Sequence, residues 1–142
     1  MAHLKSLDTS IQKTNEWLHQ IGDALKTEDR RSAYAALRGT LHALRDHLSV
    51  DEIAQLGAQL PLVVRGVYYE GWNPGSLPQH PRGKEEFLTR LHHELRGHNE
   101  LWNTEHVARV TLAVIADRVG EGEITQLLHQ LPSGIRELWP HP

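Results

Sequence analysis

Apolar residues recur at intervals of three and four along most of the chain, and this spacing predicts α-helices. A first helix is expected from about residue 8 to residue 25, with its N-cap among Asp8, Thr9 and Ser10. A second is expected over residues 27–48, because acidic residues that suit a helix start follow Thr27. The apolar stripes are Ile11, Leu18, Ile21 and Leu25 in the first helix and Leu37, Leu41, Leu44 and Leu48 in the second.

Two shorter helices are expected to complete the first half. Ser49 and Glu52 form a Ser-x-x-Glu capping box, which predicts a helix start at this point. Pro61 ends that helix and suits the first turn of the next one. Residues 62–69 are rich in Val and Tyr, so a strand is the alternative there. Helix is favoured because the matching residues 133–139 have a poor strand composition.

The second half of the chain repeats the first. Residues 34–68 align without a gap on residues 105–139, with about one position in three identical. The clearest match is the Gln-Leu-Pro of residues 59–61, which returns at residues 130–132. Such a repeat indicates two copies of one structural unit.

The repeat divides the chain into a first unit, residues 1–70, and a second unit, residues 84–142. A connector rich in Pro and Gly, residues 71–83, joins them. The second unit is expected to follow the plan of the first, with helices over 84–96, 103–119, 123–130 and 133–139. The fold predicted is an all-α bundle of about eight helices built from two four-helix units and packed as one compact domain.

Composition agrees with this class. The 142 residues can form one sizeable core, and 39% are apolar while 6% are aromatic, with Leu and Ala abundant. The net charge is −3 and neither half is basic, so no nucleic-acid partner is expected. No cysteine is present, which excludes disulfides and thiolate chemistry. No apolar stretch has the length of a membrane span, so a soluble cytoplasmic protein without membrane contact is expected.

Five features along the chain match the pattern of one family. They are Leu41-x-x-Leu44, the turn with Leu48, Ser49 and Glu52, the Gln-Leu-Pro of residues 59–61, Tyr68-Tyr69-x-Gly71-Trp72-x-Pro74, and Glu86-Phe87-Leu88. On these residues the chain resembles the bacterial domain-of-unknown-function family 2267 over nearly its whole length. The turn at residues 120–122 departs from the pattern because it lacks the Ser. The resemblance implies a small helical bacterial protein and brings no activity, cofactor or catalytic residue.

Among the eleven histidines, His92, His93 and His98 cluster with Glu94. Glu94 and His98 are four residues apart, which is an acceptable spacing for two metal ligands on one helix face. However, Gly97 is expected to end the helix first, and the histidines do not recur at matching positions of the two units. We therefore expect scattered surface histidines, no metal and no other cofactor. The alternative is a metal- or histidine-dependent enzyme built on His92, His93, Glu94 and His98.

Polar residues that occur in both units are expected to serve the fold. In particular, Arg65 and Arg136 are predicted to pair with Asp46 and Asp117 and so to tie the fourth helix of each unit to the second. No nucleophile motif and no glycine-rich phosphate loop is present, so no catalytic residue is predicted.

The best surface candidates for partner binding are Tyr68, Tyr69, Trp72 and Asn73, because aromatic residues beside a proline-rich loop are typical of binding patches. The interpretation favoured over binding is that they clamp the connector onto the core and seal the seam between the units, and the two roles do not exclude each other. The function predicted is a non-enzymatic interaction or regulatory role, with an unidentified protein partner or self-association through the surface around residues 68–80 or a groove between the units.

Overall fold

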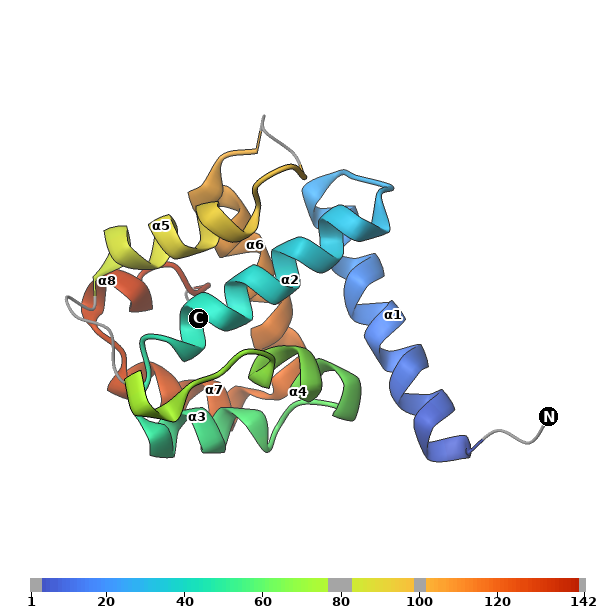
Figure 1. Ribbon diagram of the computed structural model, residues 1–142, viewed down its shortest axis with the longest axis horizontal. Helices are drawn as coiled ribbons and strands as arrows, with labels where there is room; N and C mark the ends of the chain where they lie inside the picture. Colours follow the sequence, from blue (N-terminus) through green and yellow to red (C-terminus); the bar gives the residue numbers. More distant parts are fainter. Residues whose placement is uncertain (1–3, 77–82, 99–101, 141–142) are drawn as a thin grey trace.

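The computed structural model describes residues 4–76, 83–98 and 102–140, and all regular structure in these residues is helical. This confirms the all-α class. Eight α-helices and one 3-10 turn follow one another (Figure 1). They are α1 (Lys5–Leu25), α2 (Arg30–Arg45), α3 (Val50–Gly57), α4 (Leu62–Tyr69), η1 (Pro74–Ser76), α5 (Lys84–Glu94), α6 (Thr104–Val119), α7 (Glu121–Gln130) and α8 (Ser133–Arg136).

The start of most helices follows the local sequence. Ser49 and Glu52 form the predicted capping box at α3. Asp29 caps α2 by accepting a hydrogen bond from the Arg31 N–H, and Asn103 caps α6 in the same way from the His106 N–H, each at 3.0 Å. Residues 62–69 are helical, as favoured over a strand.

The start of α1 was predicted wrongly. The helix begins at Lys5, its N-cap is Leu4, and no side chain caps it. Ser10 lies inside the helix, where its hydroxyl accepts a hydrogen bond from the Val63 N–H of α4 at 3.1 Å. The hydroxyl that suggested a cap therefore ties two helices together.

Helices α2 and α6, each of 16 residues, form the centre of the bundle (Figure 1). α2 packs against α1, α4, α5 and α6, while α6 packs against α1, α2, α5 and α7. α3 and α7 lie side by side at one end. The buried apolar residues form one cluster to which both halves of the chain contribute, including Trp17, Leu41, Leu112 and Trp139.

Arg65 and Arg136 do not pair with Asp46 and Asp117, so that prediction is wrong. Arg65 donates to the carbonyl oxygens of Gly57 and Leu60, and Arg136 donates to that of Leu131. Each arginine thus donates to the turn before its own helix, where the preceding helix has no further turn to bond its last carbonyl groups. In the part of the chain described, no helix has the length and apolarity to cross a bilayer.

Candidate interaction site

The apolar stripe of α1 has the spacing of a helix-packing seam. Its positions are three and four residues apart: Leu4, Leu7, Ile11, Thr14, Leu18, Ile21 and Leu25. From Thr14 onward this seam is buried or half-buried against the bundle. The first part behaves differently, because Leu4, Leu7 and Ile11 are 68, 44 and 53% exposed. Ile11 belongs to the predicted apolar stripe but is a surface residue.

This difference arises from the length of α1. Its first turns project past the rest of the bundle (Figure 1). α4 contacts them at Val63, which bonds to the buried Ser10, but the apolar stripe of these turns stays exposed. Leu62, at the start of α4, is also 54% exposed and is adjacent in sequence to Val63, which bonds to Ser10. Thus four of the six large exposed apolar residues in the described chain lie on or beside this end of α1.

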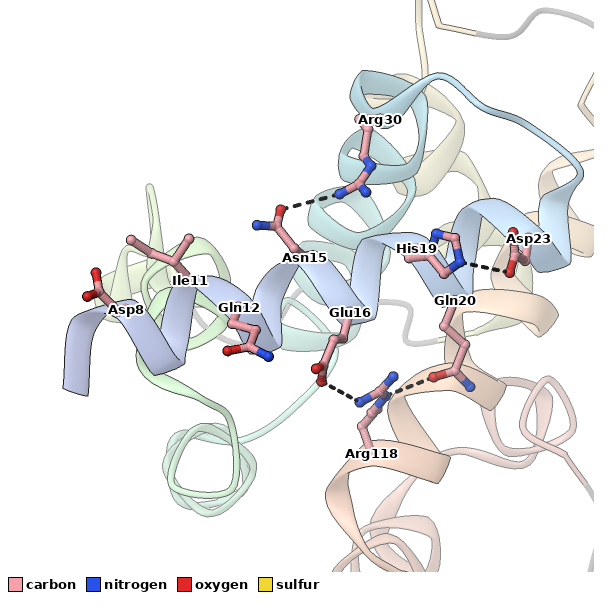
Figure 2. A pocket seen from close by; sticks show the side chains of 10 residues that line it. All are labelled: Asp8, Ile11, Gln12, Asn15, Glu16, His19, Gln20, Asp23, Arg30 and Arg118. Atoms are coloured by element: carbon pink, nitrogen blue, oxygen red, sulfur yellow. Dashed lines mark hydrogen bonds and ion pairs between the residues drawn. The ribbon is translucent and has the colours of Figure 1, made fainter. Parts of the chain in front are cut away.

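The outer face of α1 is polar and carries an open hollow of about 750 Å³ (Figure 2). Its charged groups have partners within the chain. Arg118 of α6 bonds to Gln20 at 2.8 Å and lies 3.5 Å from Glu16, and Arg30 of α2 bonds to Asn15 at 3.3 Å. This face is a solvated surface tied to its neighbours, and it lacks the enclosed geometry of a catalytic pocket.

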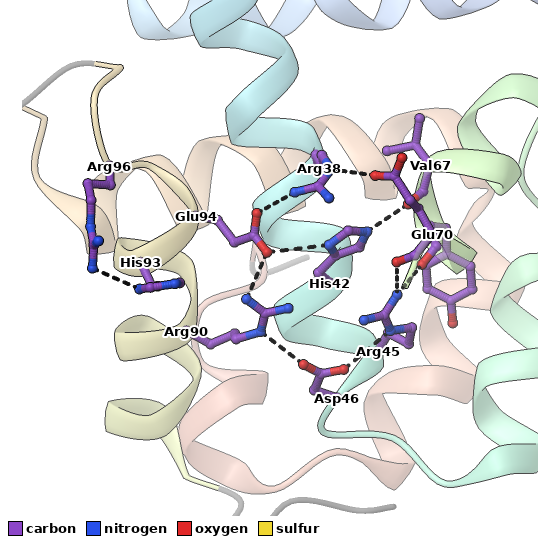
Figure 3. Close-up of polar contacts among 11 residues, drawn as sticks. Arg38, His42, Arg45, Asp46, Val67, Glu70, Arg90, His93, Glu94 and Arg96 are labelled. Carbon is purple, nitrogen blue, oxygen red and sulfur yellow. Dashed lines mark hydrogen bonds and ion pairs between the residues drawn. The ribbon is translucent and has the colours of Figure 1, made fainter. Parts of the chain in front are cut away.

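A cluster of ionic residues fills the junction of α2, α5 and the end of α4 (Figure 3). Glu94 lies at its centre, with its carboxylate 2.6 Å from Arg38 and 2.7 Å from Arg90. Arg90 also bonds to Asp46 at 3.0 Å, and Arg38 bonds to Glu70 at 2.7 Å. The cluster therefore joins the two halves of the chain through side chains.

Two further residues of α2 complete the cluster from below the surface. His42 is 1% exposed, and its Nε2–H donates to the Val67 carbonyl at 2.7 Å while Nδ1 lies 3.5 Å from Glu94. Arg45 donates to the carbonyl oxygens of Tyr68 and Glu70. These bonds satisfy the carbonyl groups at the end of α4, where no further helical turn follows to donate to them.

Burial and charge act together on the titratable groups of the cluster. Burial lowers the pKa of His42, with Arg45 and Arg38 acting in the same direction. For Glu94, burial alone would raise the pKa, but the positive charges of Arg90 and Arg38 outweigh it and the pKa is lowered. At neutral pH the cluster thus holds an ionised carboxylate and an uncharged imidazole.

The aromatic residues predicted for partner binding lie mostly inward. Tyr68 is completely buried and its hydroxyl donates to the Ile53 carbonyl at 2.9 Å, so its prediction as a surface residue is wrong. Tyr69 and Trp72 are half-buried against the core, with their ring centroids 5.6 Å apart. Asn73 is exposed and accepts a hydrogen bond from the Gly75 N–H. This arrangement fixes the start of the connector onto the bundle, and residues 77–82 lie outside the described chain.

The histidines predicted as alternative metal ligands are not brought together. α5 ends at Glu94, and Gly97 has a positive φ of 82°, so Glu94 and His98 do not share a helix face. Glu94 belongs to the ionic cluster, His92 lies 3.0 Å from Thr104, and His93 accepts from Arg96 at 3.1 Å. In the described residues no three groups of His, Asp or Glu stand close enough to hold a metal ion.

The expectation that the histidines are scattered on the surface is wrong for two of them. His42 and His47 are 1 and 2% exposed, and His47 bonds to the Ala43 carbonyl at 2.6 Å. A signal was present for His42, because Arg38, His42 and Arg45 share one face of α2 at helical spacing. The acidic partner Glu94 is 52 residues away from His42 along the chain, so the cluster itself was not visible in the sequence.

The fold and these sites define a class: an all-α protein with a buried ionic junction and an exposed apolar helix end, without a catalytic constellation among the described residues. A family model described as uncharacterized conserved protein (DUF2267) matches residues 14–138, and the chain belongs to this family. None of the curated proteins compared with the chain matches it. The matched region begins at residue 14 and therefore leaves out Leu4, Leu7 and Ile11.

Proposed function

We propose that this is a non-enzymatic interaction protein of bacterial origin, working in the cytoplasm, that pairs with a second copy of itself. The contact surface proposed is the N-terminal extension of α1, residues 4–13. The observation that carries the proposal is the exposed apolar stripe of Leu4, Leu7 and Ile11 on this extension.

The extension is an addition to the rest of the bundle. The family match begins at residue 14. Within the chain, residues 16–18 of α1 align with residues 86–88 of α5, so the α5 start at Lys84 corresponds to Thr14. Residues 4–13 thus lie outside both the family pattern and the internal repeat. Contiguous exposed apolar side chains often mark an interaction surface, and in this segment they are not needed for the fold of one chain.

The spacing of the stripe favours a helix as its partner. Side chains at intervals of three and four interlock with those of a facing helix that has the same spacing. α1 of a second copy carries that spacing, and its exposed end projects from the tip of the bundle, where the other described helices leave room for a partner (Figure 1). Two copies can therefore cover each other by a symmetric, self-complementary contact.

The pairing is expected to be weak. A stable interface covers about 800 Å² on each partner, and three or four apolar side chains supply only part of that area. A reversible dimer that forms at high protein concentration is the expected state.

Sedimentation velocity over about a hundredfold range of concentration tests the proposal. The wild-type chain is expected to shift from monomer to dimer, and the double variant Leu7→Gln, Ile11→Gln is expected to stay monomeric. The matched control is Tyr34→Gln, Val50→Gln, which replaces two exposed apolar residues elsewhere (38 and 49% exposed). A wild type that remains monomeric throughout, or a control that loses the dimer equally, would contradict the proposal.

We infer in addition that the bundle arose by duplication of a four-helix unit. Contacts that recur at matching positions of the two units support this inference. Arg65 donates to the Leu60 carbonyl and Arg136 to the Leu131 carbonyl, each at 2.9 Å. The corresponding helices α3 and α7 lie side by side, and so do α2 and α6. Comparing the stability of residues 14–70 expressed alone with that of the full chain tests whether one unit folds by itself.

A further inference from the structure

A second hollow, of about 460 Å³, opens between the end of α5 and the start of α6. His92, His93 and Arg96 line it from the α5 side, and Trp102 and Thr104 line it from the other. This volume lies within the range of small-molecule sites, roughly 300–1,000 Å³. It is separate from the extension of α1 and from the ionic cluster.

The polar groups of this hollow are arranged to donate hydrogen bonds. Arg96 donates from Nη2 to Nδ1 of His93 at 3.1 Å (Figure 3). Because Nδ1 accepts, the neutral ring carries its proton on Nε2, and that N–H remains as a donor. His92 and the Thr104 hydroxyl lie 3.0 Å apart and supply further polar groups.

The charge of the hollow is positive among the residues that the structure describes. Arg96 forms no ion pair with any of them, and none of the described lining residues is acidic. The nearest acid along α5, Glu94, points to the other side of the helix, where Arg38 and Arg90 hold it (Figure 3). A guanidinium whose described neighbours include no carboxylate partner attracts a phosphate or carboxylate group.

Trp102 adds an apolar wall to this charged rim. Trp102 is half-buried against the core. Leu95, which also lines the hollow, is 6% exposed, so the apolar side of the hollow is continuous with the core. An indole face stacks on planar rings. We propose that the hollow binds a small planar anion, an aromatic ring that carries a phosphate or carboxylate, with the ring on Trp102 and the anionic group at Arg96 and His93.

Isothermal titration of the full chain with phenyl phosphate tests this site, with benzoate, inorganic phosphate and phenol as comparisons. Phenyl phosphate or benzoate is expected to bind at least about tenfold more tightly than inorganic phosphate or phenol, because only the former engage both halves of the hollow. Which of the two binds more tightly identifies the anionic group. The indole N–H resonance of Trp102 is expected to shift during the same titration.

Surface variants locate the binding. Arg96→Gln is expected to weaken phenyl phosphate binding about tenfold or more, since a charge-assisted hydrogen bond is lost. The matched control Arg31→Gln removes an arginine whose side chain is 88% exposed on α2 and should leave binding unchanged. Trp102→Phe should retain binding and Trp102→Leu should lose it. The proposal is overturned if the wild type shows no saturable binding at millimolar probe, or if Arg96→Gln binds as well as the wild type.

Discussion

Two helix pairs in this molecule cross at corresponding places and are tied by different chemistry. α2 crosses α5, and Arg90 donates to Asp46 at 3.0 Å. α6 crosses α1, and Gln20 donates to Asp117 at 3.1 Å. Asp46 and Asp117 correspond in the proposed repeat, and so do Gln20 and Arg90. The same contact therefore occurs twice, with a charged donor in one case and a neutral donor in the other.

The charged residues around that shared contact differ more strongly between the two crossings. At α2–α5, Glu94 has 12% of its side chain exposed and binds two arginines over the buried His42. The corresponding residues at α1–α6 are Ala24 and Ala113, which cannot form ionic contacts. There the acidic partner of Arg118 is Glu16, whose side chain is 50% exposed. The α2–α5 crossing is therefore stabilised by largely buried ion pairs, whereas the α1–α6 crossing is stabilised by apolar packing and solvated polar contacts.

The residues at which the helices meet also differ between the two crossings, with the smaller residue at α2–α5. Gly39 lets α2 approach α5, because a Cβ there would lie 2.8 Å from the Cβ of Glu94 and 2.9 Å from Leu91. The corresponding residue of α6 is Val110, which is half-buried against the core. The close approach at Gly39 and the ion pairs of Glu94 thus join the two halves of the chain at the α2–α5 crossing.

The largest effect is expected from Glu94→Gln. The change leaves Arg38 and Arg90 without their shared carboxylate in a largely buried setting, and we expect the free energy of unfolding to fall by about 3 kcal/mol. Urea denaturation measures this loss. The matched control is Glu16→Gln at the other crossing, where an exposed pair is lost and a change below about 1 kcal/mol is expected. Equal losses for the two variants would show that the crossings do not differ in strength.

A smaller effect is expected from Gly39→Ala. Alanine favours a helix over glycine by about 1 kcal/mol, so propensity alone predicts stabilisation. The added Cβ would press on α5, however, and we expect a net loss of about 1–3 kcal/mol from overpacking. Thermal and urea unfolding report the sign. Gly66→Ala in α4 is the control, since no atom lies within 4 Å of the added Cβ, and a gain of about 0.5–1 kcal/mol is expected there. A stabilised Gly39→Ala variant would contradict the close crossing.

Local sequence was sufficient to predict much of the fold. The capping box at Ser49 and the Asn103 cap define helix starts through bonds within one turn, and both are present. The apolar spacing likewise predicted the right helices. It failed for Ile11, because periodicity shows which face of a helix is apolar and does not show whether another element covers that face.

The sites were less accessible to sequence reasoning for a related reason. The ionic cluster joins Arg38 to Glu94, which are 56 residues apart. No local sequence pattern around either residue indicates that the other is its partner. Tyr68 illustrates the opposite error: a tyrosine beside a proline-rich connector suggested a binding surface, but its hydroxyl is satisfied inside the bundle by the Ile53 carbonyl. Side-chain roles that depend on long-range contacts follow from the packing, which the sequence pattern does not specify.

The third prediction concerns pH and has the smallest expected effect at neutral pH. Because burial lowers the pKa of His42 in the folded state, the unfolded chain binds a proton below about pH 6.5 that the folded chain excludes. Stability is therefore expected to fall as the pH drops from about 6.5 towards 5, by up to about 1.4 kcal/mol per pH unit from this residue. The lowered pKa of Glu94 adds no loss in this window, because that carboxylate stays ionised in both states until the pH falls to its unfolded value near about 4.3.

Comparing variants isolates the contribution of His42 from those of the other histidines. Urea unfolding of His42→Gln should show a shallower loss of stability between about pH 6.5 and pH 5 than the wild type, since the glutamine does not titrate. His19→Gln is the control at the other crossing: this side chain is 69% exposed, and its removal should leave the slope unchanged. A different result would contradict this prediction: His42→Gln keeps the full slope while His19→Gln reduces it. The pH dependence would then arise at the α1–α6 crossing and not from the buried His42 at α2–α5.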